Sequence, residues 1–394
     1  MPCIRRFGIV RPATLAAVAL LALTIGAGSA QAWTLKVLYT FKGGADGYEP
    51  SGHLVRDGAT GEFYGNTVFG GQGDCGSPGC GVVFKLASDG TETVLYTFTG
   101  GADGGRPEGS LIRDPAGNLY GTTQYGGDPD CDCGVVFRLA ADGKYKVLYT
   151  FSGPDGGAPS AGLLRDAHTG DIYGTTLGGG KDHYGTVFKL ATDGTLTQLH
   201  SFSGGNDGRY PQNSSLIKDG TGNLYGTTPS GGDPVCSCGI VFKIAPNGSE
   251  SILYTFTRKT LGEPLGGLVS DKLGNLYGTG AGYFQKRHGM VFRLSPDNAL
   301  KVLYRFARSP DAAVPVGDLL RTRSGTIYGT SYYGGAHDAG TVFQLKPDGT
   351  EQVLASFGYG AFPGRGVIAD GDGNLYGTTA LDGSGYGTVF ELVK

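Results

Sequence analysis

The sequence predicts an all-β protein, a seven-bladed β-propeller with four antiparallel strands in each blade. A tyrosine within a stretch like Gly-Asn-Leu-Tyr-Gly-Thr-Thr recurs seven times at intervals near 50 residues, and such a period indicates one supersecondary unit copied in series. Glycine makes up 74 of the 394 residues without a triplet period, so it marks turns between short strands. The recurring tyrosines are Tyr64, Tyr120, Tyr173, Tyr225, Tyr277, Tyr328 and Tyr376.

The segment before the repeats, residues 1–32, is predicted to be a signal peptide. It has a basic start with Arg5, Arg6 and Arg11, an apolar run over 13–28, and a small-residue cleavage site that ends at Ala32. These features favour the general secretory route over the twin-arginine route. We expect residues 33–394 to form a single exported propeller domain without a membrane span, located in the periplasm or outside the cell.

The second unit shows the four predicted strands, named A to D in chain order. Strand A is an apolar run, and a turn at Asp114–Asn118 with Pro115 and Gly117 follows it. Strand B carries the recurring tyrosine, and strand C is rich in β-branched and aromatic residues. An Asp142-Gly143 hairpin turn then leads to strand D. The expected ranges of strands A to D are 109–114, 119–124, 134–139 and 145–151.

Two series of phenylalanines are predicted to form the core between blades, and Gly121 and its equivalents are expected to allow neighbouring blades to approach closely. The series in strand C is Phe84, Phe137, Phe188, Phe242, Phe292, Phe343 and Phe390. The series in strand D is Phe41, Phe98, Phe151, Phe202, Phe256, Phe306 and Phe357.

The phase of the repeats predicts how the ring closes. Residues 35–41 form a strand D without a preceding A, B and C, and residues 387–392 form a strand C without a following D. The first strand should therefore pair with the last one and complete the seventh blade, which removes two exposed sheet edges.

The units G-N-L-Y-G-T-T, G-T-V-F-K-L and V-L-Y-T-F resemble the GloVer tandem repeat of exported bacterial proteins, over residues 34–393. The resemblance implies export and a repeat architecture. It implies no activity and transfers no site residue.

The loops predict two unequal rims. In antiparallel blades the A–B and C–D turns share one rim, the turn rim, and the B–C and D–A loops share the other, the loop rim. The loops of the loop rim are longer and more variable than the turns of the turn rim, and variable loops on a rigid scaffold commonly carry binding sites. The candidate binding residues, at this rim or near the channel mouth, are His53, His183, Tyr184, His288, Tyr333, His337 and Asp338.

Two carboxylate patterns have alternative explanations. An aspartate recurs in the D–A loops, either as a turn former or as a partial ring of carboxylates at the channel mouth; the series is Asp46, Asp103, Asp155, Asp207 and Asp311. The segment 370–374 is similar to a calcium loop, but it has Leu375 where that loop needs glycine. An ordinary A–B turn is the favoured explanation.

Six cysteines remain after the predicted cleavage, in matched pairs just before strand C. In an exported protein such pairs indicate disulfides, and bridges within each loop are the simplest set. Zinc ligation is the disfavoured alternative because the loops belong to separate blades. The predicted pairs are Cys75–Cys80, Cys131–Cys133 and Cys236–Cys238.

Composition and motifs leave two functions open. The formal net charge of -3 lacks the excess of positive charge that is typical of nucleic-acid binding. Neither a Gly-x-Ser-x-Gly elbow nor a His-Glu-x-x-His motif is present in the sequence. The favoured hypothesis is a monomeric binding or structural module for a glycan or a cell-envelope partner, without cofactor or metal. The alternative is a propeller enzyme acting on carbohydrate, a lyase, hydrolase or lactonase.

Overall fold

The computed structural model describes residues 33–71, 73, 75, 78–212, 215–260, 262–282, 288–307, 309–382 and 385–394. The chain divides into two units, Met1–Ala32 and Trp33–Lys394, and the following description concerns the second. The predicted signal peptide, residues 1–32, lies outside the described residues. Within the described residues, no helix has the length and apolarity that a membrane span requires.

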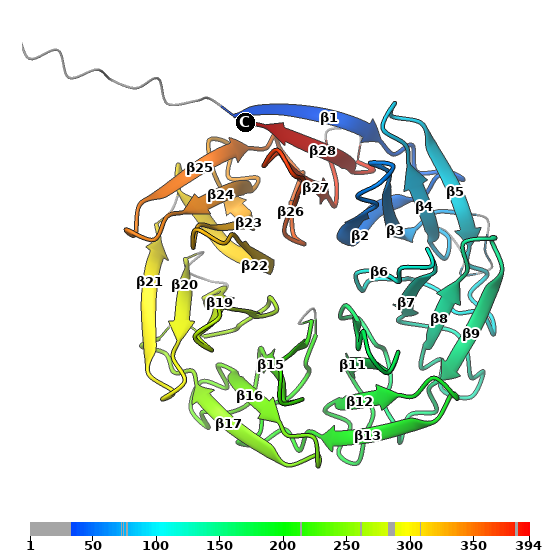
Figure 1. Ribbon diagram of the computed structural model, residues 1–394, viewed down its shortest axis with the longest axis horizontal. Coiled ribbons are helices and arrows are strands. Elements are labelled where there is room, and N and C mark those ends of the chain that lie inside the picture. Colours follow the sequence, from blue (N-terminus) through cyan, green and yellow to red (C-terminus); the bar gives the residue numbers. More distant parts are fainter. Residues whose placement is uncertain are drawn as a thin grey trace, which may run out of the picture. The chain divides into compact units, whose positions relative to one another are not determined.

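The described part of Trp33–Lys394 forms seven antiparallel sheets of four strands each, arranged around a ring (Figure 1). This confirms the predicted seven-bladed propeller. The innermost strands, A, are β2 (Tyr48–Arg56), β6 (Ile112–Arg113), β10 (Leu164–Arg165), β14 (Ile217–Lys218), β18 (Val269–Ser270), β22 (Ala312–Arg321) and β26 (Ile368–Ala369). Strands B are β3 (Phe63–Phe69), β7 (Leu119–Thr123), β11 (Ile172–Thr176), β15 (Leu224–Thr228), β19 (Leu276–Gly280), β23 (Ile327–Gly334) and β27 (Leu375–Thr379).

The two outer positions of each blade complete the sheets. Strands C are β4 (Val82–Leu86), β8 (Val135–Leu139), β12 (Thr186–Leu190), β16 (Ile240–Ile244), β20 (Gly289–Leu294), β24 (Thr341–Leu345) and β28 (Thr388–Val393). Strands D are β5 (Glu92–Thr97), β9 (Tyr145–Thr150), β13 (Leu196–Ser201), β17 (Glu250–Thr255), β21 (Leu300–Phe306), β25 (Glu351–Ser356) and β1 (Thr34–Thr40). The blades are numbered one to seven in chain order, starting with β2–β5. Most A strands are shorter than predicted.

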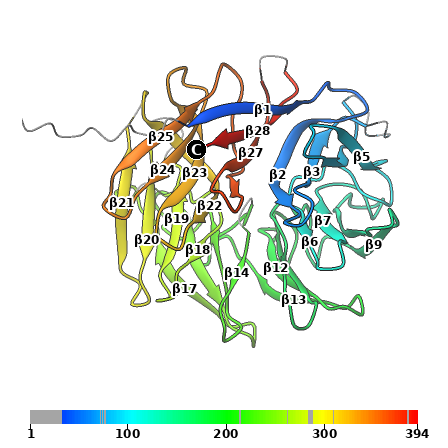
Figure 2. The same cartoon turned by 45° about the horizontal axis from the view of Figure 1, so that its top comes forward.

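The first and last strands close the ring as predicted. Strand β1 pairs antiparallel with β28, from Thr34 opposite Val393 to Thr40 opposite Thr388. Figures 1 and 2 both show the two strands side by side. Because β1 covers the outer edge of β28, blade seven has the same four strands as the others and β28 exposes no free edge.

Seven phenylalanine pairs hold neighbouring blades together. In each pair a strand D ring of one blade packs against the strand C ring of the next, with ring centroids 4.9 to 5.4 Å apart. Both series are buried. Most of the pairs are edge-to-face, a geometry that adds to the burial of apolar area. The predicted inter-blade core is confirmed.

The recurring strand B glycine has a different role from the predicted one. A Cβ atom at Gly121 would lie 2.6 Å from Phe137 Cζ and 2.8 Å from Leu111 Cδ2. Both residues belong to the same blade as Gly121. The glycine therefore makes room for its own blade's phenylalanine, which in turn reaches the neighbouring blade.

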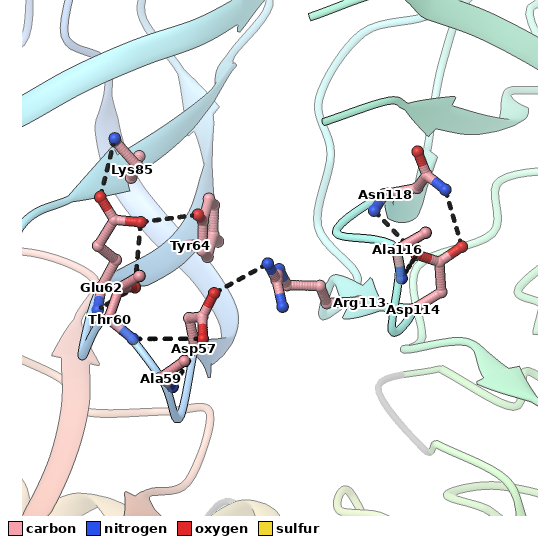
Figure 3. Close-up of polar contacts among 10 residues, drawn as sticks. All are labelled: Asp57, Ala59, Thr60, Glu62, Tyr64, Lys85, Arg113, Asp114, Ala116 and Asn118. Carbon is pink, nitrogen blue, oxygen red and sulfur yellow. Dashed lines mark hydrogen bonds and ion pairs between the residues drawn. The ribbon is translucent and has the colours of Figure 1, made fainter. Parts of the chain in front are cut away.

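The turn rim is held by repeated carboxylate contacts (Figure 3). In blade one, Asp57 accepts a hydrogen bond from the Ala59 N–H at 2.8 Å. Arg113, at the end of strand A of blade two, forms an ion pair with Asp57 at 2.9 Å. In the next turn Asp114 accepts hydrogen bonds from the Ala116 and Asn118 N–H groups. The turn rim thus combines local capping with a cation from the neighbouring blade.

The segment 370–374 forms the same turn. Asp370 Oδ1 accepts the Asp372 and Asn374 N–H groups, and Oδ2 accepts the Tyr376 hydroxyl at 2.9 Å. This carboxylate is engaged in the way that Asp114 is, which supports the favoured turn explanation.

Candidate functional site

The loop rim carries a ring of seven residues with left-handed backbone, one per blade and each followed by a buried proline. Their φ angles lie between 46 and 62°. Residues other than glycine rarely adopt a positive φ, and a following proline restricts the residue before it to extended conformations. The surrounding structure must therefore hold each of these residues in place. We name this set the pre-proline ring: Glu49, Arg106, Ala158, Tyr210, Glu263, Val314 and Phe362.

Backbone contacts fix each member of this ring. The Ala158 N–H donates to the Cys133 carbonyl of the preceding blade at 2.9 Å, and the Ala158 carbonyl accepts from the Leu177 N–H of its own blade at 3.2 Å. A Cβ atom at Gly134 would lie 2.9 Å from Pro159 Cδ, so glycine before strand C makes room for the proline. These contacts involve the backbone and the proline only. Where the side chain at the ring position is not packed in the core, as that of Val314 is, it can therefore change without disturbing the frame.

The described structure contains the three predicted disulfides, Cys75–Cys80, Cys131–Cys133 and Cys236–Cys238. The second cysteine of each pair supplies the carbonyl that accepts the N–H of the ring residue in the next blade. Each bridge thus braces one of the loops that hold Arg106, Ala158 and Glu263. This is a role in positioning the rim.

A pocket of about 380 Å³ opens beside two members of the ring. Its lining comes from the D–A loops that enter blades four and five and from the ends of strand B in blades three and four. We name it the rim pocket, and it is lined by Leu177, Tyr210, Gln212, Pro229, Ser230, Glu263 and Leu265. The volume lies in the usual range for small-ligand sites.

The rim pocket combines an aromatic ring with a few polar groups. Tyr210 is 37% exposed, and its ring packs against Tyr184 with centroids 5.5 Å apart. The Arg209 guanidinium lies over both rings. Glu263 Oε2 is buried without a hydrogen-bond partner among the described residues, and burial raises the pKa of this carboxyl. Such an acceptor would gain from a ligand hydroxyl or amide.

The cavity at His53 in the central channel is too small for an organic ligand. His53 and Asp318 line the same small cavity, together with Ser110, Ser215 and Arg365, and its volume is about 10 Å³. This is room for about one water molecule. Burial lowers the pKa of His53 despite the nearby Asp318 carboxylate. The sequence places both residues at the start of strand A, and the structure brings them together inside the channel.

The other predicted rim residues are dispersed. His183, His288 and His337 lie on blades three, five and six, and His183 and His337 are exposed. Asp338 accepts a hydrogen bond from the Gly334 N–H at 3.0 Å, which caps its own loop. Tyr333 is half-buried and packs against Phe362 at 5.9 Å. Of the predicted set, Tyr184 comes nearest to the rim pocket, through its contact with Tyr210.

The recurring loop aspartates have a structural role at the outside of the ring. Asp46 accepts the Tyr39 hydroxyl at 2.8 Å and the Lys42 N–H at 2.9 Å. Asp103 does the same with Tyr96 and Thr99. Because these tyrosines belong to the outermost strands, the carboxylates do not form a ring at the channel mouth. The turn explanation holds.

The sequence analysis missed Tyr210, Gln212 and Glu263. A signal was available, because the proline recurs in every unit while the residue before it differs in nearly every one. A fixed proline beside a variable neighbour indicates a constant backbone that presents a changing side chain.

Known structures share the propeller fold at low sequence identity. The extracellular domain of a candidate hybrid two-component system from B. thetaiotaomicron aligns over 91% of this chain and 39% of its own, with 12% identity and a TM-score of 0.56. A candidate 6-phosphogluconolactonase from Bacteroides uniformis aligns over 80% and 88%, with 17% identity and a TM-score of 0.52. At these identities the likeness concerns the fold alone. None of the curated proteins matches the chain.

The family comparison covers the repeats themselves. The Gloeobacter/Verrucomicrobia repeat matches residues 24–166, 129–323 and 235–394, and these overlapping matches span every blade. This confirms the resemblance to the GloVer repeat. The chain therefore belongs to the Gloeobacter/Verrucomicrobia repeat family.

Proposed function

We propose that the protein is an exported binding module that holds a glycan in the rim pocket. The observation that carries this proposal is the pocket itself, because it lies on the divergent rim and is lined by residues from three blades. Ligand sites of this size are mostly apolar with a few placed polar groups. The rim pocket has that composition.

A saccharide matches the lining chemically. The face of a sugar ring is apolar and can stack on the partly exposed Tyr210 ring. The hydroxyl groups at the edge of the sugar ring can be bound by the Gln212 amide, the Ser230 hydroxyl and the unpartnered Glu263 oxygen. The contact with Tyr184 and Arg209 orients the Tyr210 ring before a ligand arrives, which reduces the entropy that binding would cost.

Export is part of the proposal. The basic and apolar N-terminal segment, the three disulfides and a structural neighbour that is an extracellular domain all support it. A location in the periplasm or outside the cell would give the module access to glycans and to components of the cell envelope.

Binding is favoured over catalysis by the charge of the pocket. Among the described residues that line it, Glu263 is the only carboxylate. Hydrolysis of a glycosidic bond commonly uses two carboxyl groups that flank the bond. One carboxylate beside an aromatic ring suits recognition better than such a reaction.

A glycan array probed with the purified protein tests the proposal, with Tyr210→Ala and Tyr359→Ala as a matched pair. Tyr359 is 92% exposed on another loop of the same rim, so its removal controls for the loss of a surface tyrosine. We expect at least one glycan class to bind, and Tyr210→Ala to lower the affinity roughly ten-fold, about 1.4 kcal/mol. Tyr359→Ala should bind like the wild type.

Three outcomes would oppose the proposal. The first is an array without any bound glycan. The second is equal loss of affinity in both tyrosine variants. The third is chemical conversion of a bound glycan that Glu263→Gln abolishes, which would favour the enzyme alternative.

A further inference from the structure

Three metal-binding side chains converge where the outer strands of blades three and four meet. His200 lies near the end of β13, Asp207 in the loop that follows, and Glu250 at the start of β17; Figure 1 shows these strands as neighbours at the periphery. His200 Nε2 lies 3.5 Å from Asp207 Oδ2 and 3.9 Å from Glu250 Oε2. The three ligand atoms all lie within 4.8 Å of one another.

The same place in other blades provides an internal comparison. Two further junctions have an aspartate and a glutamate at the equivalent positions, Asp46 with Glu92 and Asp311 with Glu351. In both, a tyrosine stands where blade three has His200. The Tyr39 hydroxyl donates to Asp46 at 2.8 Å, and the Tyr304 hydroxyl donates to Asp311 at 3.2 Å.

The exchange of tyrosine for histidine changes what the junction can bind. A neutral phenol satisfies the aspartate by donating a hydrogen bond, whereas a neutral imidazole offers a nitrogen lone pair to a cation. His200 Nε2 and Glu250 Oε1 are buried and have no hydrogen-bond partner among the described residues. Glu92 Oε1 and Glu351 Oε1 lack one as well, so the imidazole nitrogen is what distinguishes this junction. The junction therefore holds two adjacent carboxylates and an imidazole whose bonding capacity is unused. A bound cation would use that capacity and offset the repulsion between the carboxylates.

The distances suit a transition metal. Zinc bonds of about 2.1 Å to nitrogen and oxygen put neighbouring ligand atoms of a tetrahedron about 3.4 Å apart. The separation of 3.5 Å between His200 and Asp207 already matches this value, and that of 3.9 Å to Glu250 needs a shift of well under 1 Å. The separation between the two carboxylates is at most 4.8 Å, and a bound ion would draw them closer together. The side chains are 14 to 18% exposed, which leaves access for the ion and for water as a further ligand.

Neighbouring groups orient two of the three side chains, Asp207 and His200. Asp207 Oδ2 accepts the Ser203 N–H at 2.8 Å, and Oδ1 accepts the Ser203 hydroxyl at 2.6 Å. The His200 ring packs edge-on against Phe202 at 4.8 Å. Such supporting contacts are typical of metal sites, in which they fix the direction of each ligand.

We propose that His200, Asp207 and Glu250 bind one divalent transition metal ion, for which Zn²⁺ is the best match to one imidazole and two carboxylates. The ion would connect the outer strand of blade three to that of blade four, and it would use none of the cysteines that the sequence analysis weighed as zinc ligands. This departs from the expectation of a protein without metal. The sequence alone does not show that His200 and Glu250 lie close together, because they belong to different blades.

Calorimetric titration of the chelator-treated protein with Zn²⁺ tests this site. We expect one equivalent to bind, and His200→Tyr to lower the affinity on the order of 100-fold or more, since it removes a ligand outright. This variant restores the tyrosine of the other junctions and should fold. His183→Tyr, which changes an exposed histidine of the same blade, is the matched control and should bind as the wild type does. Ser203→Ala should weaken binding roughly ten-fold.

A gain of function gives a second test. Tyr304→His creates the same three groups beside Asp311 and Glu351, and we expect it to raise the stoichiometry from one to two equivalents. The proposal is overturned if the wild type binds no zinc, or if His200→Tyr binds it as tightly as the wild type. A metal-independent change in melting temperature on His200→Tyr, without any zinc binding, would assign the histidine a purely structural role.

Discussion

The phenylalanine layer between the blades and the pre-proline ring on the loop rim occur seven times each, yet only one of them repeats its side chains. Every junction of the layer pairs two buried phenylalanines at nearly the same distance. The ring repeats its backbone conformation equally well. Its side chains, however, include two glutamates, an arginine, an alanine, a valine and two aromatic residues.

The difference shows where the fold constrains a residue. Each phenylalanine touches neighbours on all sides, so any change in volume leaves a cavity or a clash. At the ring the backbone groups and the proline are held, whereas the side chains differ in environment, from the buried Val314 to Tyr210, which is 37% exposed. The fold can therefore keep the ring constant in shape while its chemistry varies, and the rim pocket lies where two of its members, Tyr210 and Glu263, meet.

Removing the closing strand should have the largest effect on this framework. Deletion of residues 33–42 takes away β1, leaves blade seven with three strands and exposes the edge of β28. We expect loss of the cooperative fold or aggregation, measured by circular dichroism and size-exclusion chromatography. A monomeric product with an unchanged melting temperature would contradict the role of β1.

Truncation within the repeated layer comes next. Phe137→Ala should destabilise the protein by about 3–5 kcal/mol, because the ring is completely buried between Phe98 and its own blade. Chemical denaturation measures this change. Tyr359→Ala at the exposed rim is the control and should stay within about 0.5 kcal/mol of the wild type. Similar losses for both variants would remove the distinction between layer and rim.

The carboxylate junctions at the outside of the ring predict a smaller, pH-dependent effect. Burial raises the pKa of Glu92 and of Glu351 to about 7, with Asp46 and Asp311 adding repulsion. A carboxyl whose pKa is raised by folding contributes most to the free energy of unfolding below its unfolded pKa, where it is protonated in both states. This contribution is lost as the pH rises to the pKa of the folded state. The stability that these groups provide should therefore fall between about pH 4.5 and pH 7.

The double variant Glu92→Gln/Glu351→Gln tests this sign. The difference in free energy of unfolding between this variant and the wild type should shift in favour of the variant from pH 5 to pH 8. We expect a shift of about 1 kcal/mol per site after allowance for solvent screening. Glu62→Gln is the control, because the hydrogen bond from Lys85 lowers the pKa of Glu62. This carboxyl is ionised in both states throughout the window, so the stability of the control relative to the wild type should not change between pH 5 and pH 8. An advantage of the double variant that does not change with pH would contradict the assignment.

The framework was predictable because its causes are local and repeated. The spacing of Tyr64 to Tyr376 sets the number of blades, and the unmatched strands at 35–41 and 387–392 predict how the ring closes. The disulfides followed from cysteines within one loop. The role of Gly121 was predicted wrongly, since the sequence does not say which blade provides the ring that fills the space.

The candidate sites were less predictable because they depend on packing between blades. The pairing of Tyr210 with Glu263 joins loops more than 50 residues apart in sequence. His53 and Asp318 are brought together across the channel, and His200 meets Glu250 across a junction. Comparison of the units position by position would mark Tyr210 and His200 as departures, but their partners become evident only in three dimensions.

Hydrogen–deuterium exchange with a glycan selected from the array shows whether the divergent rim holds the ligand. We expect protection in the loops around Tyr210–Gln212 and Glu263–Leu265, and unchanged exchange in the turns Asp114–Asn118 and Asp142–Lys144. Protection confined to those turns would contradict it, since the ligand would then lie on the turn rim, opposite the pocket.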